Sequence, residues 1–451
     1  MSSKAKLLSA LRIVLLWTAL LIPLGLSVGS LCAFFLWALK AVTDYRLSHP
    51  SILFALPIAG VGVGLLYYWC GGKAEGGNNL IIDEIHKPGG GVPLRMAPLV
   101  LLGTIISHLF GASVGREGTA VQIGGSIAGG IAKLFNLSPQ STRLLLTAGI
   151  AAGFGAVFGT PIAGAIFALE VLALGELNYA ALLPVAAASI IADWVCHLWG
   201  IHHTAYHVGF QGGSAQNGSF FHTNALLFIK VCLASIAFGL VSRCFARSIQ
   251  FLSSTFKKLC PLPWLRPAIG GLLTILLVEI LGTRDYLGLG VTSPLPDHPS
   301  IVNFFTLHHY TWSWFFKLIF TVTALSTGFK GGEVTPLFFI GAGLGNALAP
   351  LLNVPVDLLA GIGFVSVFAG AANTPLACTF MAVELFGATN IVYYAAGCFI
   401  AYITSGHTGI YQSQIIGYPK NIWSNLLAGR TLRDTHNLPP ASIHKTTSQH
   451  E

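Results

Sequence analysis

Residues 115–128 read GREGTAVQIGGSIA, and residues 331–345 read GGEVTPLFFIGAGLG. Both stretches open on glycine, place a glutamate third, and continue into small and apolar residues. Residues 159–170 (GTPIAGAIFALE) and 373–384 (NTPLACTFMAVE) repeat each other in the same way, with nine positions from proline to glutamate in each copy. Corresponding positions in the two copies are 214 to 216 residues apart. The chain therefore contains an internal duplication.

Apolar segments recur along the whole chain around these stretches. Of 451 residues, 54% are hydrophobic and only 9% are charged, whereas soluble proteins carry about 25% charged residues. Some apolar windows approach the ~20 residues that a spanning helix needs, and others are too short to cross a bilayer alone. We expect an all-α integral membrane protein, built from two related halves of many tilted and broken helices, with the halves inverted relative to each other.

The composition also suggests how the chain is divided. We expect an N-terminal cytoplasmic segment over 1–10, membrane repeats over 11–222 and 223–428, and a disordered polar tail over 429–451. The net charge of +8 lies largely in loops and at the ends, which favours anchoring by the positive-inside rule over nucleic-acid binding. The eight cysteines are scattered without paired spacing, so neither a disulfide framework nor a metal site is predicted. No cofactor is expected.

The duplication and the broken helices together indicate transport. Transporters with internal repeats place their site between the repeats, near the middle of the membrane, and build it from discontinuous helices. A helix that starts inside the bilayer has free N–H groups and a positive dipole end. Such ends attract anions. The sequence therefore predicts movement of a small anion.

Glu117 is the leading candidate for a functional residue, because an ionisable side chain in an apolar membrane segment is costly to bury. The flanking Gly115, Arg116 and Gly118 are candidate anion-binding residues, and the two glycines allow backbone amides to approach a ligand closely. A plain ion pair with Arg116 is the alternative. We expect that pair to be minor, because neighbouring side chains at a helix start point apart.

Five further positions are candidates for anion contacts. Gly332, Val334 and Thr335 are the second-half counterparts of the residues around Glu117, although plain helix capping would explain Val334, Thr335 and Pro336 nearly as well. Asn78, in a glycine-led helix start, can offer an amide donor or merely cap the helix. Tyr411 can point its hydroxyl inward, although a lone tyrosine at a membrane boundary is usually an interfacial anchor.

Other features receive structural interpretations. Glu170 and Glu384 occur once in each half, and we expect them to tie helix ends together. Ser113 lies in a GxSxG pattern, but an intramembrane serine hydrolase is a remote alternative because no convincing histidine partner is present. The GAGLG glycines of 341–345 indicate close helix packing. Residues 201–222 hold four histidines and are expected to form a solvated loop: His202, His203, His207 and His222.

At these residues the chain resembles the CLC family of chloride channels and anion/proton antiporters. Residues 115–118 resemble its GREGP motif with Thr119 in place of proline, residues 332–336 resemble its GxFxP motif, and Tyr411 stands where its inner-gate tyrosine is expected. The resemblance implies a homodimer with two separate pores. It also implies that the Glu117 carboxylate competes with the anion and carries the proton.

The departures from the family pattern favour one branch. Residues 76–80 (GGNNL) replace the usual GSGIP, Val334 replaces the phenylalanine of GxFxP, and Val171 stands where an inner proton-transfer glutamate is expected. This set is similar to the bacterial fluoride/proton antiporters, which makes Asn78 the selectivity candidate. A chloride channel or chloride/proton antiporter of the same fold is the alternative. The expected location is the bacterial inner membrane, with fluoride or chloride and protons as the transported ions.

Overall fold

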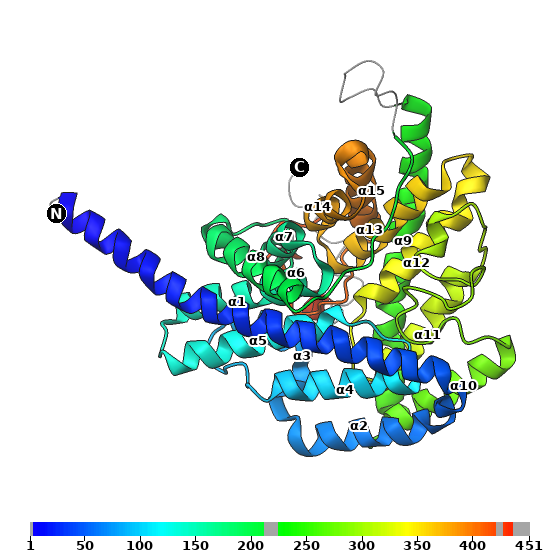
Figure 1. Cartoon of the computed structure of the whole chain (residues 1–451), viewed down its shortest axis with the longest axis horizontal. Helices are drawn as coiled ribbons and strands as arrows, with labels where there is room; N and C mark the ends of the chain where they lie inside the picture. The colour runs from blue at the N-terminus through cyan, green and yellow to red at the C-terminus, as the bar shows by residue number, and fades with distance from the viewer. Residues whose placement is uncertain (1–2, 212–223, 421–426, 436–451) are drawn as a thin grey trace, which may run out of the picture.

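The computed structural model describes residues 3–211, 224–420 and 427–435, with side chains from residue 11 onward. The fold is mostly helical (Figure 1). The helices of the first half are α1 (Ser3–Ser48), α2 (Leu56–Cys70), α3 (Gly77–His86), α4 (Met96–Phe110), α5 (Glu117–Leu134), α6 (Pro139–Phe158), α7 (Pro161–Glu170) and α8 (Leu182–Leu198).

The second half follows the same plan. Its helices are α9 (Ala225–Leu259), α10 (Arg266–Leu281), α11 (Ser313–Thr327), α12 (Val334–Leu352), α13 (Val356–Ala372), α14 (Pro375–Phe386), α15 (Ile391–Thr404) and the short α16 (Leu432–Thr435). Short 3-10 turns stand at η1 (Pro50–Ala55), η2 (Gly72–Gly76), η3 (Tyr179–Ala181), η5 (Asn303–Phe305) and η6 (Ala388–Asn390). Two short parallel strands, β1 (Ala173–Leu174) and β2 (Ile415–Ile416), join the halves.

The two halves pack in matching ways. Helix α5 packs on α6 as α12 packs on α13, and α1 packs on α8 as α9 packs on α15. Helices with the same place in each half also meet, since α2 contacts α10 and α7 contacts α14. Helix α3 has no counterpart, because residues 282–312 between α10 and α11 contain only the turn η5.

The two Thr-Pro signatures act as matched helix breaks. Gly159 directly follows α6 and Asn373 directly follows α13, and both residues adopt a left-handed conformation, with φ of +70° and +60°. Glycine and asparagine are the residues that tolerate this conformation best at a helix C-terminus. Pro161 and Pro375 then occupy the first turn of the next helix, where the missing N–H has no cost.

The central helices pack closely because of their glycines. A Cβ added at Gly124 of α5 would collide with the carbonyl oxygen of Gly149 in α6. In the second half, a Cβ at Gly341 of α12 would collide with the carbonyl oxygen of Gly363 in α13. Small residues allow this backbone approach inside a membrane. The structural interpretation of the 341–345 glycines is confirmed.

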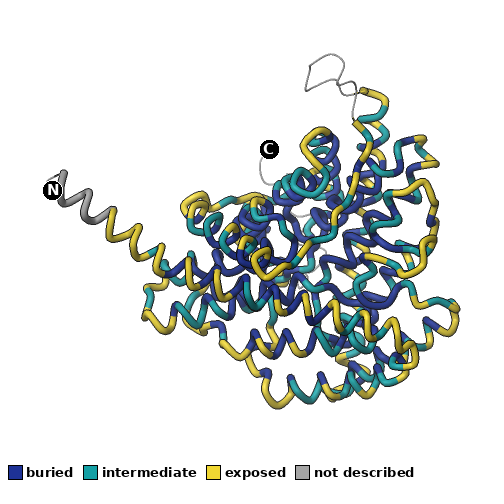
Figure 2. The backbone as a smooth tube through the Cα atoms, in the orientation of Figure 1, coloured by how far each residue is buried: buried dark blue, intermediate teal, exposed yellow. Residues whose placement is uncertain are grey.

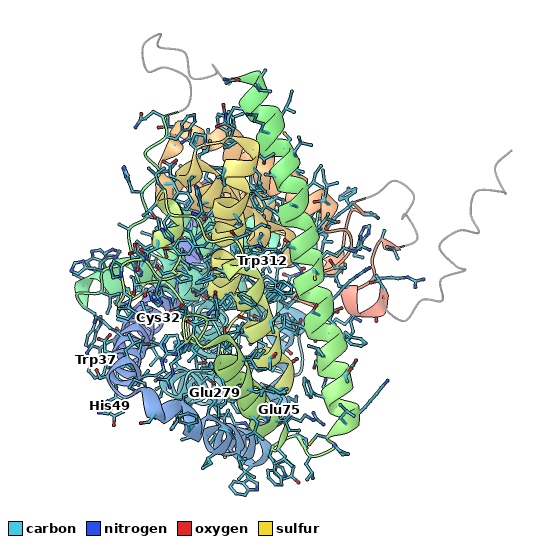
Figure 3. All side chains as sticks on the ribbon, turned by 90° about the vertical axis from the view of Figure 1, so that its right-hand side faces the viewer. Cys32, Trp37, His49, Glu75, Glu279 and Trp312 are labelled. Atoms are coloured by element: carbon cyan, nitrogen blue, oxygen red, sulfur yellow. The ribbon has the colours of Figure 1, made fainter. Side chains whose placement is uncertain are left out.

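The outer surface is apolar, as a membrane protein requires. Trp37 and Trp312 are more than half exposed, and Trp37 lies at the outer edge of the molecule in Figure 3. The most buried helices, α6, α12 and α13, lie in the middle of the fold (Figure 2). Six helical segments among the described residues are long and apolar enough to span a bilayer, and others are shorter apolar helices. The expected mixture of full and broken helices is confirmed.

Two expectations about the chain's segments need correction. The tail was expected to be disordered from residue 429, but residues 429–435 are ordered: the Leu432 amide donates to the Gln414 carbonyl, and Leu432 is fully buried. Residues 436–451 lie outside the described part. The histidine-rich stretch is not simply solvated either, because Val208 is buried and Phe210 packs on the core. His222 lies outside the described residues.

Candidate functional site

The two glycine-led stretches meet at the centre of the fold. Helix α5 begins at Glu117 and α12 at Val334, so both start where the sequence predicts. The residues just before them pair as a short antiparallel bridge, in which the Gly332 amide donates to the Gly115 carbonyl at 2.8 Å and the Gly115 amide donates in return. A Cβ at Gly332 would stand 2.7 Å from the Gly118 nitrogen. Only glycine fits there.

The Glu117 carboxylate lies across the N-terminus of α12. Its Oε2 accepts from the Thr335 amide at 3.0 Å and from the Arg116 amide at 3.1 Å. Its Oε1 accepts from the Thr335 hydroxyl. The side chain is almost completely buried. A carboxylate here occupies an anion-binding helix N-terminus.

Arg116 lies closer to Glu117 than expected. Its Nε is 3.5 Å from Glu117 Oε1, so the prediction that the two side chains diverge was wrong. The cause is the bend before α5, which leaves Arg116 outside the helix as its N-cap residue. The ion pair does not replace the other contacts, because Thr335 still contributes both of its donors to the carboxylate.

A cavity lies on the Arg116 side of the carboxylate. Its wall includes Arg116, Glu117, His203, Tyr206, Thr335 and Phe338. Charged and polar groups therefore meet aromatic rings at the approach to Glu117. Of these residues, His203 and Tyr206 come from the segment after α8.

Asn78 lies beside the first turn of α5. A Cβ at Gly118 would stand 3.0 Å from the Asn78 side-chain nitrogen, so the amide lies against the start of α5. The Asn78 side-chain oxygen has no hydrogen-bond partner within the described part of the chain. The neighbouring Asn79 accepts from the Ser413 amide at 3.0 Å, which ties α3 to the segment that carries Tyr411.

Tyr411 points into the protein and is not an exposed interfacial residue. It is only 4% exposed, and its ring packs edge-on against Phe167 with centroids 6.2 Å apart. It interacts electrostatically with Glu117 and Glu333. The structure thus brings Tyr411 and Asn78 to the same centre as the two helix starts, where Val334 is also buried.

Glu333 is a further candidate residue, to which the sequence pattern assigned no role. It directly precedes α12, and its Oε2 would lie 3.8 Å from a Cβ at Gly118. It also interacts electrostatically with Glu117. Its position could have identified it as a site residue, because Glu333 of the second repeat aligns with Glu117 of the first.

The other glutamate pair has the structural role expected of it. The Glu170 carboxylate accepts from the amides of Leu376 and Ala377 at 3.0 and 2.8 Å, capping α14. Glu384 accepts from the amides of Ile162 and Ala163 at 3.0 and 2.7 Å, capping α7. Each half thus caps a helix of the other. This exchange is what a pseudo-twofold relation between the repeats produces.

Ser113 shows no sign of a hydrolase site. In the described structure its hydroxyl hydrogen-bonds the Thr321 hydroxyl at 2.9 Å, and both side chains are buried. A nucleophilic serine needs a neighbouring base. A threonine hydroxyl is not one.

Comparison with known proteins agrees with this geometry. The sequence profile described as voltage gated chloride channel matches residues 59–406. A Pseudomonas syringae pv. tomato protein named chloride/fluoride channel protein is 50% identical over 411 residues, covering 90% of this chain and 87% of the relative.

Solved structures extend the comparison to the fold. One described as a CLC-type fluoride/proton antiporter matches with a TM-score of 0.82 at 34% identity, covering 89% of this chain and 98% of that one. A slow cyanobacterial Cl−/H+ antiporter matches with a TM-score of 0.69 at 17% identity, covering 95% and 98%. The second likeness concerns the fold alone.

Proposed function

The chain belongs to the voltage gated chloride channel family, the CLC proteins, and we propose that it exports fluoride across the bacterial inner membrane in exchange for protons. The observation that carries this proposal is the Glu117 carboxylate held by donors at the start of α12. An ionised carboxylate and a halide need the same N–H and O–H donors, so they compete for one place. Movement of Glu117 then couples the anion to the proton.

The donor set suits fluoride. Fluoride is small and holds its water tightly, so a binding site must replace that water with short, strong donors. The Thr335 hydroxyl and amide, the Arg116 amide and the Asn78 side-chain amide are such donors around one centre. A protonated Glu117 can also donate to fluoride, which links binding of the anion to binding of the proton.

We propose that the proton leaves Glu117 through nearby carboxyl and hydroxyl groups. Glu333 and Tyr411 both interact electrostatically with Glu117. Val171 stands where chloride/proton antiporters are expected to have a proton-transfer glutamate, and valine cannot carry a proton. The Glu333 carboxyl group can exchange a proton with Glu117 in its place. We further propose that two such chains form a homodimer with one pore in each subunit.

Chloride transport is the second candidate, because the Pseudomonas relative carries both halides in its name. Ion efflux from liposomes separates the two. The purified protein is reconstituted into vesicles loaded with fluoride or chloride, valinomycin clamps the voltage, and electrodes record the released halide and the external pH. We expect fluoride release with proton uptake, and little chloride release.

Two substitutions extend this experiment. Glu117→Gln is expected to abolish fluoride-driven proton uptake, and Asn78→Ala is expected to lower the fluoride-to-chloride ratio about tenfold, the equivalent of one hydrogen bond to a charged group. Equal release of both halides by the unaltered protein would reject the fluoride assignment. Undiminished proton uptake in Glu117→Gln would reject the role of Glu117.

A further inference from the structure

Three side chains with metal-binding atoms gather beside the pore cavity. Asp193 and His197 stand one turn apart on α8 and so share a face of the helix. The chain reverses at Gly200, whose φ of +75° is left-handed, and brings His203 back toward them. One oxygen or nitrogen from each of the three side chains lies within 4.8 Å of the other two.

The geometry within this cluster is compact. His197 Nδ1 is 3.5 Å from Asp193 Oδ1. The rings of His197 and His203 have centroids 5.4 Å apart and meet nearly edge-to-face. A zinc ion holds such ligands at about 2.0–2.2 Å, so small side-chain rotations would close the three atoms onto one ion.

Two acceptor atoms in the cluster lack the donors that buried acceptors normally have. Asp193 Oδ1 and His203 Nε2 are both buried, and neither has a hydrogen-bond partner within the described residues. Most buried polar side-chain atoms are paired. These two atoms without hydrogen-bond donors, in side chains that lie close together, suit a bound cation.

His203 offers a ring nitrogen to a metal. Its Nε2 is buried and has no hydrogen-bond partner among the described residues. A neutral imidazole with its proton on Nδ1 presents a lone pair on Nε2.

The cluster is connected to the transport site through His203. This residue lines the cavity with Arg116 and Glu117. Its ring also lies against Gly159, between the helix break of α6 and the capped start of α7. An ion bound to His203 would therefore fix one wall of the cavity through which the anion approaches Glu117.

We propose that Asp193, His197 and His203 bind a divalent transition-metal ion of the zinc class, and that this ion slows anion exchange. Two imidazoles and one carboxylate match the ligand preference of zinc, and water would complete the tetrahedron. The effect on exchange rests on the function proposed above, whereas binding of the ion does not.

Binding is tested first, with zinc chloride titrated calorimetrically into the metal-stripped full-length protein in detergent. We expect one strong site per chain, weakened at least about tenfold by His197→Ala or His203→Ala. His207→Ala, an exposed histidine of the same segment, is the matched control and should bind as the unaltered protein does. Zinc bound elsewhere on the chain contributes equally to the titrations of all four proteins, so it does not affect their comparison. No strong site, or equal binding by all four, would overturn the proposal.

Exchange is tested next in liposomes, with zinc on both sides of the membrane. We expect zinc to slow the unaltered protein and His207→Ala several-fold. His197 is not among the residues that line the cavity. His197→Ala should therefore exchange fluoride for protons at the normal rate without zinc, and zinc should not slow it. Zinc that binds at this site without slowing exchange would overturn the regulatory part. A chain inactive toward fluoride would still bind zinc, so the two failures are distinguishable.

Discussion

Replacing Thr335 by valine removes one donor from the Glu117 carboxylate and keeps the shape of the side chain. The hydroxyl that donates to Oε1 is lost, while the amide that donates to Oε2 at 3.0 Å remains. A hydrogen bond to a charged group contributes about 1.5–3 kcal/mol. The state with Glu117 docked on α12 should therefore be populated about ten- to 150-fold less, relative to the released state.

Proton-coupled exchange in liposomes measures this loss. If Glu117 returns to α12 in every cycle, fluoride-driven proton uptake by Thr335→Val should be at least about tenfold slower than in the unaltered protein. Thr335→Ser keeps the hydroxyl and should retain most of the rate. Thr274→Val is a matched control, because the buried Thr274 hydroxyl donates to the Gly270 carbonyl of its own helix α10. Normal proton uptake by Thr335→Val would refute the reasoning.

Two further predictions concern the cross-capped helices and the close approach at the site. Glu170→Ala leaves the amides of Leu376 and Ala377 without their acceptor, which should lower stability by about 2–6 kcal/mol. Thermal unfolding in detergent should show a clear drop in Tm, smaller in Glu170→Gln, and an unchanged Tm would contradict the capping role. Gly118→Ala places a Cβ 3.0 Å from the Asn78 amide nitrogen and should slow fluoride exchange. Gly62→Ala in α2, where a Cβ meets nothing within 4 Å, should leave the rate of fluoride exchange unchanged. Equal exchange rates for the two variants would contradict the close approach of Gly118 to Asn78.

The repeat in the sequence predicted the helix starts well. The glycines before Glu117 and Val334 mark real helix N-termini, and the Thr-Pro pairs mark real breaks. These signals are local, because a left-handed residue or a proline dictates backbone conformation wherever it stands. The duplication also indicates that the two repeats fold alike, so residues at matching positions should have matching roles. The capping role of Glu170 and Glu384 could be predicted for this reason.

Features that depend on long-range packing were missed. The approach of Arg116 to Glu117 follows from the bend before α5, which stands next to the bridge between Gly115 and Gly332 that joins the halves. The gathering of His203 with Asp193 requires the chain to reverse after α8. The sequence spacing places His197 four residues after Asp193, on the same face of a helix. It does not show that His203, beyond the helix, would return to that face.

The central claim is that the Glu117 carboxylate occupies the place where fluoride binds. Calorimetric titration of fluoride into Glu117→Ala and into the unaltered protein tests it most directly. Removal of the carboxylate leaves the Thr335 and Arg116 donors free in every molecule, so the apparent affinity for fluoride should rise. Fluoride affinity that stays the same or falls in Glu117→Ala would contradict the account.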